Sequence, residues 1–128
     1  MEPTTVVYMI VYVFLAILLF RILAPIKGLK KLTPVEFIQQ TKASPNKMVI
    51  DVREPHEYKS GHLEGAVNIP VSKLKSQLGG IPKETRIFLY CRSGMRSRTA
   101  GRIFLKNGFA EVAHLHGGIL GWEGKIVK

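Results

Sequence analysis

Residues 87–98 read IFLYCRSGMRSR, an apolar run followed at once by a cysteine and an arginine-rich polar segment. The apolar residues 87–90 are typical of a strand that is buried on both faces of a parallel sheet. A helix is expected to follow from Ser97, the candidate N-cap, to Asn107. Ligands of open α/β sheets bind at the carboxyl ends of the strands, so Cys91 lies where chemistry is expected.

The loop from Cys91 to Arg96 has the features of an anion cradle around a reactive thiol. A tight turn into a helix N-terminus directs backbone N–H groups inward, and Gly94 allows the close bend. These amides, the helix dipole and the guanidinium groups of Arg92 and Arg96 all favour a thiolate, which is the nucleophilic form. The same arginines could also bind an anionic substrate. An inert, buried cysteine is the alternative, but it leaves the polar loop unexplained.

The rest of the domain alternates short apolar strands with helices and shows no hairpin signal, which predicts a parallel α/β sheet. Thr33, Pro34 and Glu36 have the spacing of a capping box at a helix start. Further strands are expected over residues 48–52, 67–69 and 112–115. Further helices are expected near 55–58, over 71–78, and in a short turn after Gly117-Gly118.

The N-terminal segment is apolar and carries no charge from Pro3 to Phe20. It is long enough for a bilayer-spanning helix, and we expect an uncleaved transmembrane anchor over residues 4–24. A cleaved signal peptide is the alternative, but its basic segment would precede the apolar run, where Glu2 lies. The cations follow the run instead, at Arg21, Lys27, Lys30 and Lys31. The positive-inside rule therefore predicts a single-pass membrane protein whose C-terminal domain faces the cytoplasm.

Three segments are expected: the anchor over 4–24, a basic linker over 25–31 and a folded domain over 32–128. The net charge of +10 favours contact with anionic lipid headgroups. No basic and aromatic stretch has the spacing of a stacking platform, so a nucleic-acid partner is not expected. The sequence gives no signal for an oligomeric state.

Three blocks of the chain resemble single-domain rhodaneses, a family of sulfurtransferases. They are DVREPHEYKSGHLEGAVNIP (51–70), YCRSGMRS (90–97) and HLHGGILGW (114–122), and they occur in the family's order and spacing. The resemblance runs from near Lys31 to Gly124 and leaves out the anchor. It implies a rhodanese-like five-stranded parallel sheet with helices on both faces.

The resemblance also implies an activity. Cys91 would take a sulfane sulfur from a donor such as thiosulfate or a persulfide, and would pass it to a thiophilic acceptor. The implied partners are this small-molecule or protein donor and acceptor, together with the membrane, and no cofactor is implied. The residues that would hold the persulfide are Arg92, Ser93, Gly94, Met95, Arg96 and Ser97.

Loop length separates activities within this fold. Phosphatases of the cell-division-cycle type carry one residue more between Cys and Arg than the four that separate Cys91 from Arg96. The smaller ring suits a sulfur atom better than phosphate or arsenate, and Tyr90 occupies the position where those phosphatases typically carry His. A phosphatase or arsenate reductase, and a non-catalytic docking module of rhodanese fold, are the alternative functions.

Polar residues outside the loop have structural interpretations. Asp51 and Arg53 flank a strand end near the site, and an ion pair is expected there. His114 and His116 would share one face of a strand, but no third ligand is in register with them, so no metal site is expected.

Overall fold

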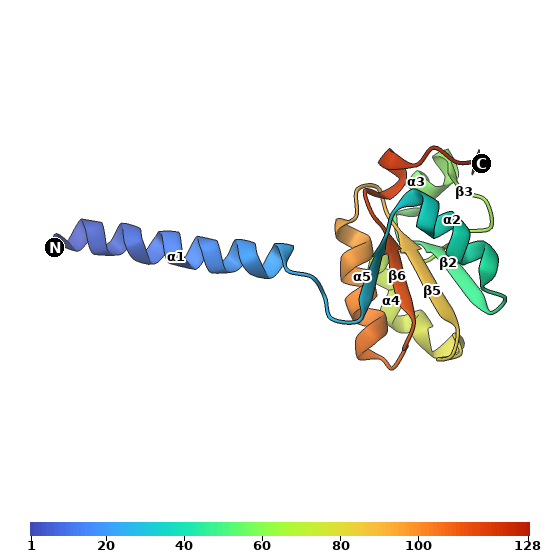
Figure 1. Ribbon diagram of the computed structural model, residues 1–128, viewed down its shortest axis with the longest axis horizontal. Coiled ribbons are helices and arrows are strands. Elements are labelled where there is room, and N and C mark those ends of the chain that lie inside the picture. Colours follow the sequence, from blue (N-terminus) through green and yellow to red (C-terminus); the bar gives the residue numbers. More distant parts are fainter.

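The computed structural model describes all of residues 1–128, as a long N-terminal helix joined to an α/β domain (Figure 1). The helix α1 (Pro3–Leu23) projects away from the domain, and none of its residues is buried. Its 21 residues correspond to a length of about 30 Å, the thickness of a bilayer's hydrocarbon core. By length and composition, α1 is therefore able to cross a membrane.

Five parallel strands form the central sheet, which confirms the predicted fold class. Their order is β1-β6-β5-β2-β4, so β5 lies in the middle. The strands are β1 (Leu29–Leu32), β2 (Lys47–Asp51), β4 (Val67–Asn68), β5 (Arg86–Tyr90) and β6 (Val112–Leu115).

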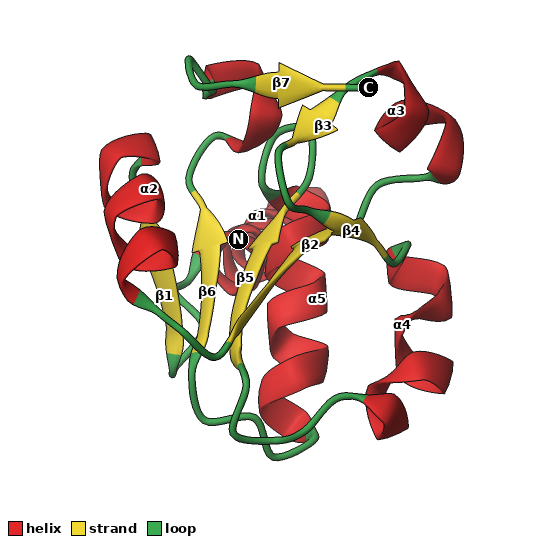
Figure 2. Cartoon of the chain, turned by 90° about the vertical axis from the view of Figure 1, so that its right-hand side faces the viewer, coloured by secondary structure: helices red, strands yellow, loops and turns green.

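Helices cover both faces of the sheet (Figure 2). The helix α2 (Pro34–Ala43) packs on β1 and β6, whereas α4 (Val71–Gln77) and α5 (Met95–Lys106) cover the other face. Two 3₁₀ turns complete this set, η1 (Leu78–Gly80) and η2 (Gly118–Gly121).

A small cap lies over the carboxyl ends of the strands, at the top of Figure 2. It consists of α3 (Pro55–Ser60) and an antiparallel ribbon of β3 (His62–Leu63) and β7 (Ile126–Val127). The carboxyl edge of the sheet is therefore covered by structure that can position a site.

The central strand β5 is buried on both faces, and its side chains alternate between two cores. Leu89 and Cys91 pack with Phe104 under α4 and α5, whereas Phe88 and Tyr90 pack with the α2 side of the sheet. This alternation is the two-residue period of a strand. Cys91 therefore directs its side chain toward the face that α5 covers.

Three parts of the structure differ from the sequence-based expectation. Residues 29–31, expected in the basic linker, form most of β1, an edge strand whose two lysines remain exposed. The antiparallel pair β3–β7 was not expected at all. The helix α5 begins at Met95 rather than Ser97, because Gly94 makes the turn into the helix with φ +115°.

The capping box of α2 is confirmed, since Thr33 Oγ accepts a hydrogen bond from Glu36 N.

Candidate active site

Cys91 follows β5 directly, and only 1% of its surface is exposed. Its Sγ accepts a hydrogen bond from the backbone N–H of Gly94 at 3.0 Å. Its thiol also donates to Ser97 Oγ at 3.7 Å. The amide of Gly94 would also donate to the sulfur of an anionic group formed at this position.

The N-terminus of α5 lies beside this sulfur. The first hydrogen bond of the helix runs from Arg98 N to Gly94 O, so the amides of Met95, Arg96 and Ser97 have no backbone acceptor. Such unpaired amides, together with the helix dipole, form an anion site. The loop can therefore stabilise both a thiolate and an anionic group attached to it.

A second loop holds the backbone of the cysteine loop in place. Ile119 N donates to Cys91 O at 2.9 Å, and Leu120 N donates to Arg92 O at 3.1 Å. This approach requires Gly118, which has φ +61° and whose added Cβ would lie 2.3 Å from Arg92 O. The sequence predicted only a short helical turn after Gly117-Gly118, so this positioning role was missed.

Arg96 is paired with a carboxylate from the cap. Its Nη1 and Nη2 donate to the two carboxylate oxygens of Glu57 on α3, at 2.6 and 3.0 Å. These bonds raise the pKa of Arg96, and an electrostatic interaction with Cys91 raises it further. Arg96 therefore fixes the loop to α3, and its charge also lies within electrostatic range of Cys91.

The other residues predicted for the loop lie on its surface. Arg92, Ser93 and Met95 are exposed, and Gly94 is half-buried. The guanidinium of Arg92 forms no hydrogen bond or ion pair with the protein. Because Arg96 is neutralised by Glu57, Arg92 is the loop's free cation for an incoming anion.

Ser97 was expected to be the N-cap of α5. It lies instead in the first turn of the helix and is buried. Its hydroxyl donates to Gly94 O at 3.1 Å, and its Oγ lies 3.1 Å from His114 Nδ1 on β6. Burial, followed by the charges of Lys31, Arg98 and His116, lowers the pKa of His114 to about 4. A neutral imidazole therefore supports Ser97 beneath the sulfur at neutral pH.

The expected pair of Asp51 and Arg53 is present and buried. Arg53 Nη2 donates to Asp51 Oδ2 at 2.7 Å and to Gly61 O at 2.7 Å. The pair joins the end of β2 to the cap, so it has a structural position next to the loop. No group of three or more His, Cys, Asp or Glu side chains is arranged to hold a metal ion.

Comparisons with known proteins identify the family. The model of the rhodanese-like domain matches residues 33–125. The chain belongs to the rhodanese-like family. A crystal structure of a rhodanese-related protein from Thermoplasma volcanium superposes with a TM-score of 0.68 at 26% identity, over 77% of this chain and 97% of that one.

Two curated relatives extend this finding. A putative mitochondrial thiosulfate sulfurtransferase of Schizosaccharomyces pombe is 38% identical over 92 residues, covering 62% of this chain and 65% of that protein. The uncharacterized protein YqhL of Bacillus subtilis is 37% identical over 120 residues, covering 91% of this chain and 93% of YqhL. This coverage exceeds the domain, so the similarity to YqhL extends into the N-terminal segment. At the family level, the relatives support a rhodanese sulfurtransferase.

Tyr90, which differs from the His of related phosphatases, has a structural position in this rhodanese. Its side chain is fully buried, and its hydroxyl accepts a hydrogen bond from Leu63 N at 3.1 Å. Burial raises the pKa of its phenol well above the ordinary value. Tyr90 therefore joins the sheet to the cap and lies on the opposite face of β5 from Cys91.

The Glu57–Arg96 pair should give the rhodanese domain an acid-dependent stability. The hydrogen bond from Arg96 lowers the pKa of Glu57 from 4.5 to about 2. The contribution of the pair is therefore present above about pH 4.5 and is lost as the pH falls toward 2. Glu57→Gln should lower the free energy of unfolding by about 1 kcal/mol at pH 7, because the pair is partly solvent-screened. Urea unfolding at pH 7 and pH 3 measures this, and an equal loss at both pH values would contradict it.

His114 should make the free energy of unfolding depend on pH in a higher range than Glu57 does. Its pKa is about 4 in the folded chain, against an ordinary value of 6.5, so protons bind preferentially to the unfolded chain between these values. The free energy of unfolding should therefore fall as the pH decreases from 6.5 to 4. In His114→Asn this fall should be smaller, whatever the variant's stability at pH 7. Urea unfolding at pH 7, 5.5 and 4.5 gives the two slopes, and equal slopes would refute the assignment.

Proposed function

We propose that this protein is a membrane-anchored sulfurtransferase that carries sulfane sulfur as a persulfide on Cys91. One observation supports the proposal above all others. The sulfur of the chain's single cysteine accepts the N–H of Gly94 at 3.0 Å, at the N-terminus of α5. The rhodanese-like match and the sulfurtransferase relative favour sulfur transfer over other reactions of a thiolate.

The first half-reaction loads the cysteine. The Cys91 thiolate attacks the outer sulfur of thiosulfate or of a persulfide donor, forming a new S–S bond. The donor's S–S bond breaks, and sulfite or a thiolate leaves with the electron pair. The product is an anionic Cys91 persulfide, whose terminal sulfur the amides of Met95, Arg96 and Ser97 and the cation of Arg92 would stabilise.

The second half-reaction unloads it. An acceptor such as cyanide or a thiolate attacks the terminal sulfur, and Cys91 leaves as the thiolate. In both steps the leaving group keeps the electron pair of the broken S–S bond, so the sulfur is transferred without a change in its oxidation state. The cycle therefore returns the protein to its starting state without an external oxidant or reductant. A cofactor is not required for either step.

The membrane part of the proposal is based on α1. The helix is wholly exposed and apolar, and Arg21, Lys27, Lys30 and Lys31 follow its charge-free part. We therefore place the domain on the cytoplasmic side of a single span. In sealed membrane vesicles of known orientation, protease should remove the domain only where the cytoplasmic face points outward. Cleavage in the opposite orientation would contradict this topology.

Mass spectrometry of the intact protein tests the sulfur chemistry. After incubation with thiosulfate, the full-length protein in detergent should gain about 32 Da, the mass of one sulfur on the thiol. Reduction should remove this gain, and Cys91→Ser should show none. A wild type without the adduct, or an equal adduct on Cys91→Ser, would refute the proposal.

The alternative activities predict a different result from the same two proteins. A phosphatase of this fold would hydrolyse an aryl phosphate in a reaction that Cys91→Ser abolishes. The proposal expects no such turnover, since the loop holds only four residues between Cys91 and Arg96. Cys91-dependent phosphate release without a persulfide would replace sulfur transfer with phosphoryl transfer as the function.

A further inference from the structure

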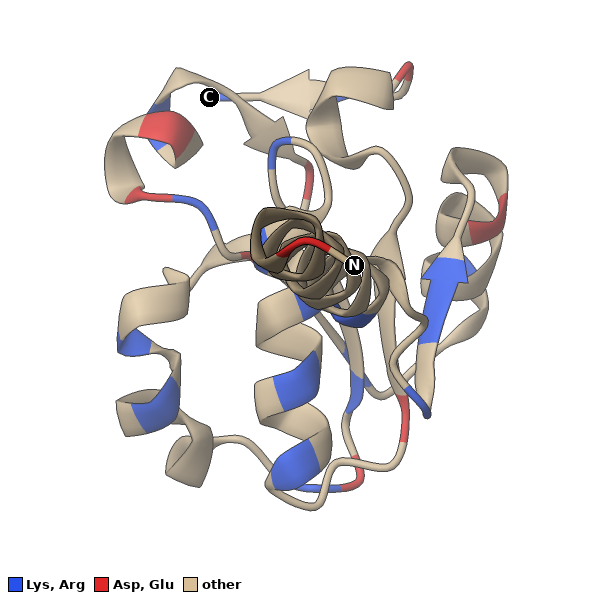
Figure 3. Cartoon of the chain, turned by 90° about the vertical axis from the view of Figure 1, so that its left-hand side faces the viewer, with Lys and Arg blue, Asp and Glu red and all other residues tan.

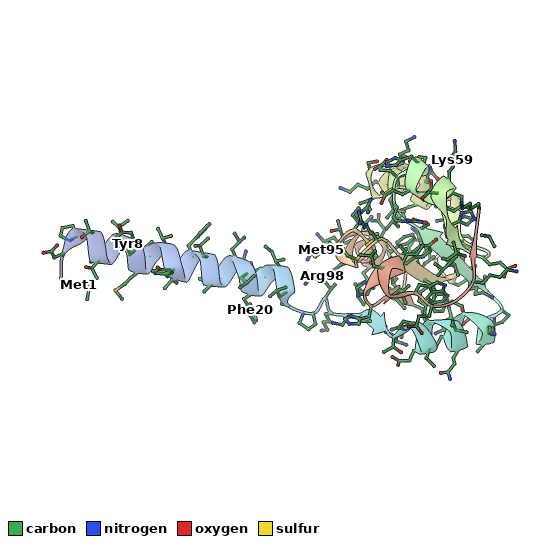
Figure 4. All side chains as sticks on the ribbon, turned by 90° about the horizontal axis from the view of Figure 1, so that it is seen from above. Met1, Tyr8, Phe20, Lys59, Met95 and Arg98 are labelled. Atoms are coloured by element: carbon green, nitrogen blue, oxygen red, sulfur yellow. The ribbon has the colours of Figure 1, made fainter.

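A basic hollow of about 480 Å³ lies where α1 meets α5. Figure 3 views the side of the domain from which α1 projects, with Lys and Arg in blue. Figure 4 shows Met95 and Arg98 at this junction, beside the end of α1. The residues that line the hollow are Arg21, Ile22, Met95, Arg98, Thr99 and Arg102.

Arg98 joins the two helices. Its guanidinium donates hydrogen bonds to the backbone oxygens of Ile22 and Ala24. These carbonyls belong to the C-terminal end of α1, where no further helix amide is available to them. A cation there is also favoured by the helix dipole. The contact therefore holds the end of α1 against the first turn of α5.

The positive charge in the hollow has no carboxylate partner. Three arginines line it, Arg21, Arg98 and Arg102, and none of them forms an ion pair within the chain. No Asp or Glu contributes to the lining. Planar guanidinium groups bind phosphate with paired hydrogen bonds, so Arg21 and Arg102, which are not engaged as Arg98 is, suit a phosphate group.

The position of the hollow at the end of α1 indicates which kind of molecule would supply that phosphate. Arg21 lies in the last turn of α1, and Ile22 adds an apolar wall to the hollow. If α1 spans the bilayer, the end of its apolar surface coincides with the headgroup layer. An anionic phospholipid would then present its phosphate to the arginines and its acyl chains to α1.

We propose that this hollow binds the headgroup of an anionic phospholipid, an inference that rests on the proposed membrane anchoring by α1. Met95 lines the hollow and also belongs to the Cys91 loop, and 58% of its surface is exposed. The bound lipid would therefore keep the active-site loop next to the membrane surface. Sulfur donors and acceptors would reach Cys91 along that surface.

Lipid retention by the full-length protein tests this inference. The protein is incorporated into nanodiscs of equal phosphatidylglycerol and phosphatidylcholine, released in mild detergent, and analysed by native mass spectrometry. The wild type should retain phosphatidylglycerol in preference to phosphatidylcholine. Arg21→Gln/Arg102→Gln should reduce this retention about tenfold. The control Lys73→Gln/Lys75→Gln, which removes the same charge from exposed positions of α4, should retain the lipid as the wild type does.

The other outcomes overturn the inference in distinguishable ways. Equal retention of both lipids, or an arginine variant that behaves like the wild type, would show that the hollow is not a lipid site. Displacement of the lipid by millimolar inorganic phosphate would identify a site for a free anion. Release of the protein from membranes by alkaline carbonate would refute the anchor as well, whereas a protein that stays in the membrane without lipid preference refutes only the lipid site.

Discussion

Replacing Gly118 with alanine is expected to lower the free energy of unfolding by about 3 kcal/mol or more and to abolish persulfide formation on Cys91. The new Cβ would lie 2.3 Å from Arg92 O and 2.6 Å from Cys91 O. Both contacts are with backbone, which cannot move aside without moving the cysteine loop. The displaced loop would also lose the hydrogen bonds from Ile119 N and Leu120 N.

Gly117 provides the matched control for this substitution. It also has a positive φ, +77°, but an added Cβ there would meet no atom within 4 Å. Gly117→Ala should therefore cost only the backbone strain, about 1–2 kcal/mol, and should leave the loop able to form a persulfide. Urea unfolding and intact-protein mass spectrometry measure both effects. Equal losses of stability and persulfide in the two variants would contradict the role of Gly118.

Replacing Asp51 with asparagine should lower the free energy of unfolding by about 3–5 kcal/mol. The carboxylate is completely buried and holds Arg53, of which only 5% is exposed. The variant keeps the shape of the side chain but leaves a buried guanidinium without its counter-charge. That uncompensated charge, rather than the loss of one ion pair, is the cause of the large effect.

The ion pair of Glu64 and Lys125 offers a control on the surface. Its atoms are 3.4 Å apart, and both side chains are more than half exposed. Glu64→Gln should therefore change the free energy of unfolding by less than about 1 kcal/mol. Thermal or urea unfolding of the two variants compares the pairs directly. The account of the buried pair fails if Asp51→Asn costs no more than Glu64→Gln.

The parts of the fold set by local sequence could be predicted. The apolar run 87–90 placed β5, since a strand buried on both faces needs such a run. Thr33 and Glu36 placed the start of α2, because a capping box involves only residues three apart. The apolar run also placed Cys91 at a strand end, because Cys91 directly follows it. The strand β1 was missed because its sequence, LKKL, is half charged, and its pairing with β6 is long-range.

The parts of the candidate site set by long-range contacts could not be predicted. Glu57 and Arg96 are 39 residues apart, and only the packing of α3 over the sheet brings them together. Ser97 and His114 meet because α5 packs against β6. Their sequence signals, a serine in a helix start and a histidine in a strand, also have simpler interpretations. The close approach of Gly118 to Arg92 likewise depends on the arrangement of two loops.

Transfer of a labelled sulfur through Cys91 tests the proposed function most directly. The full-length protein is loaded with thiosulfate that carries radiolabel in its outer sulfur, separated from the donor, and then given cyanide. The account predicts that one labelled sulfur per chain binds to the protein and leaves as thiocyanate, and that Cys91→Ser neither binds nor transfers it. Label that never binds, or that stays on the protein after cyanide is added, would contradict the account.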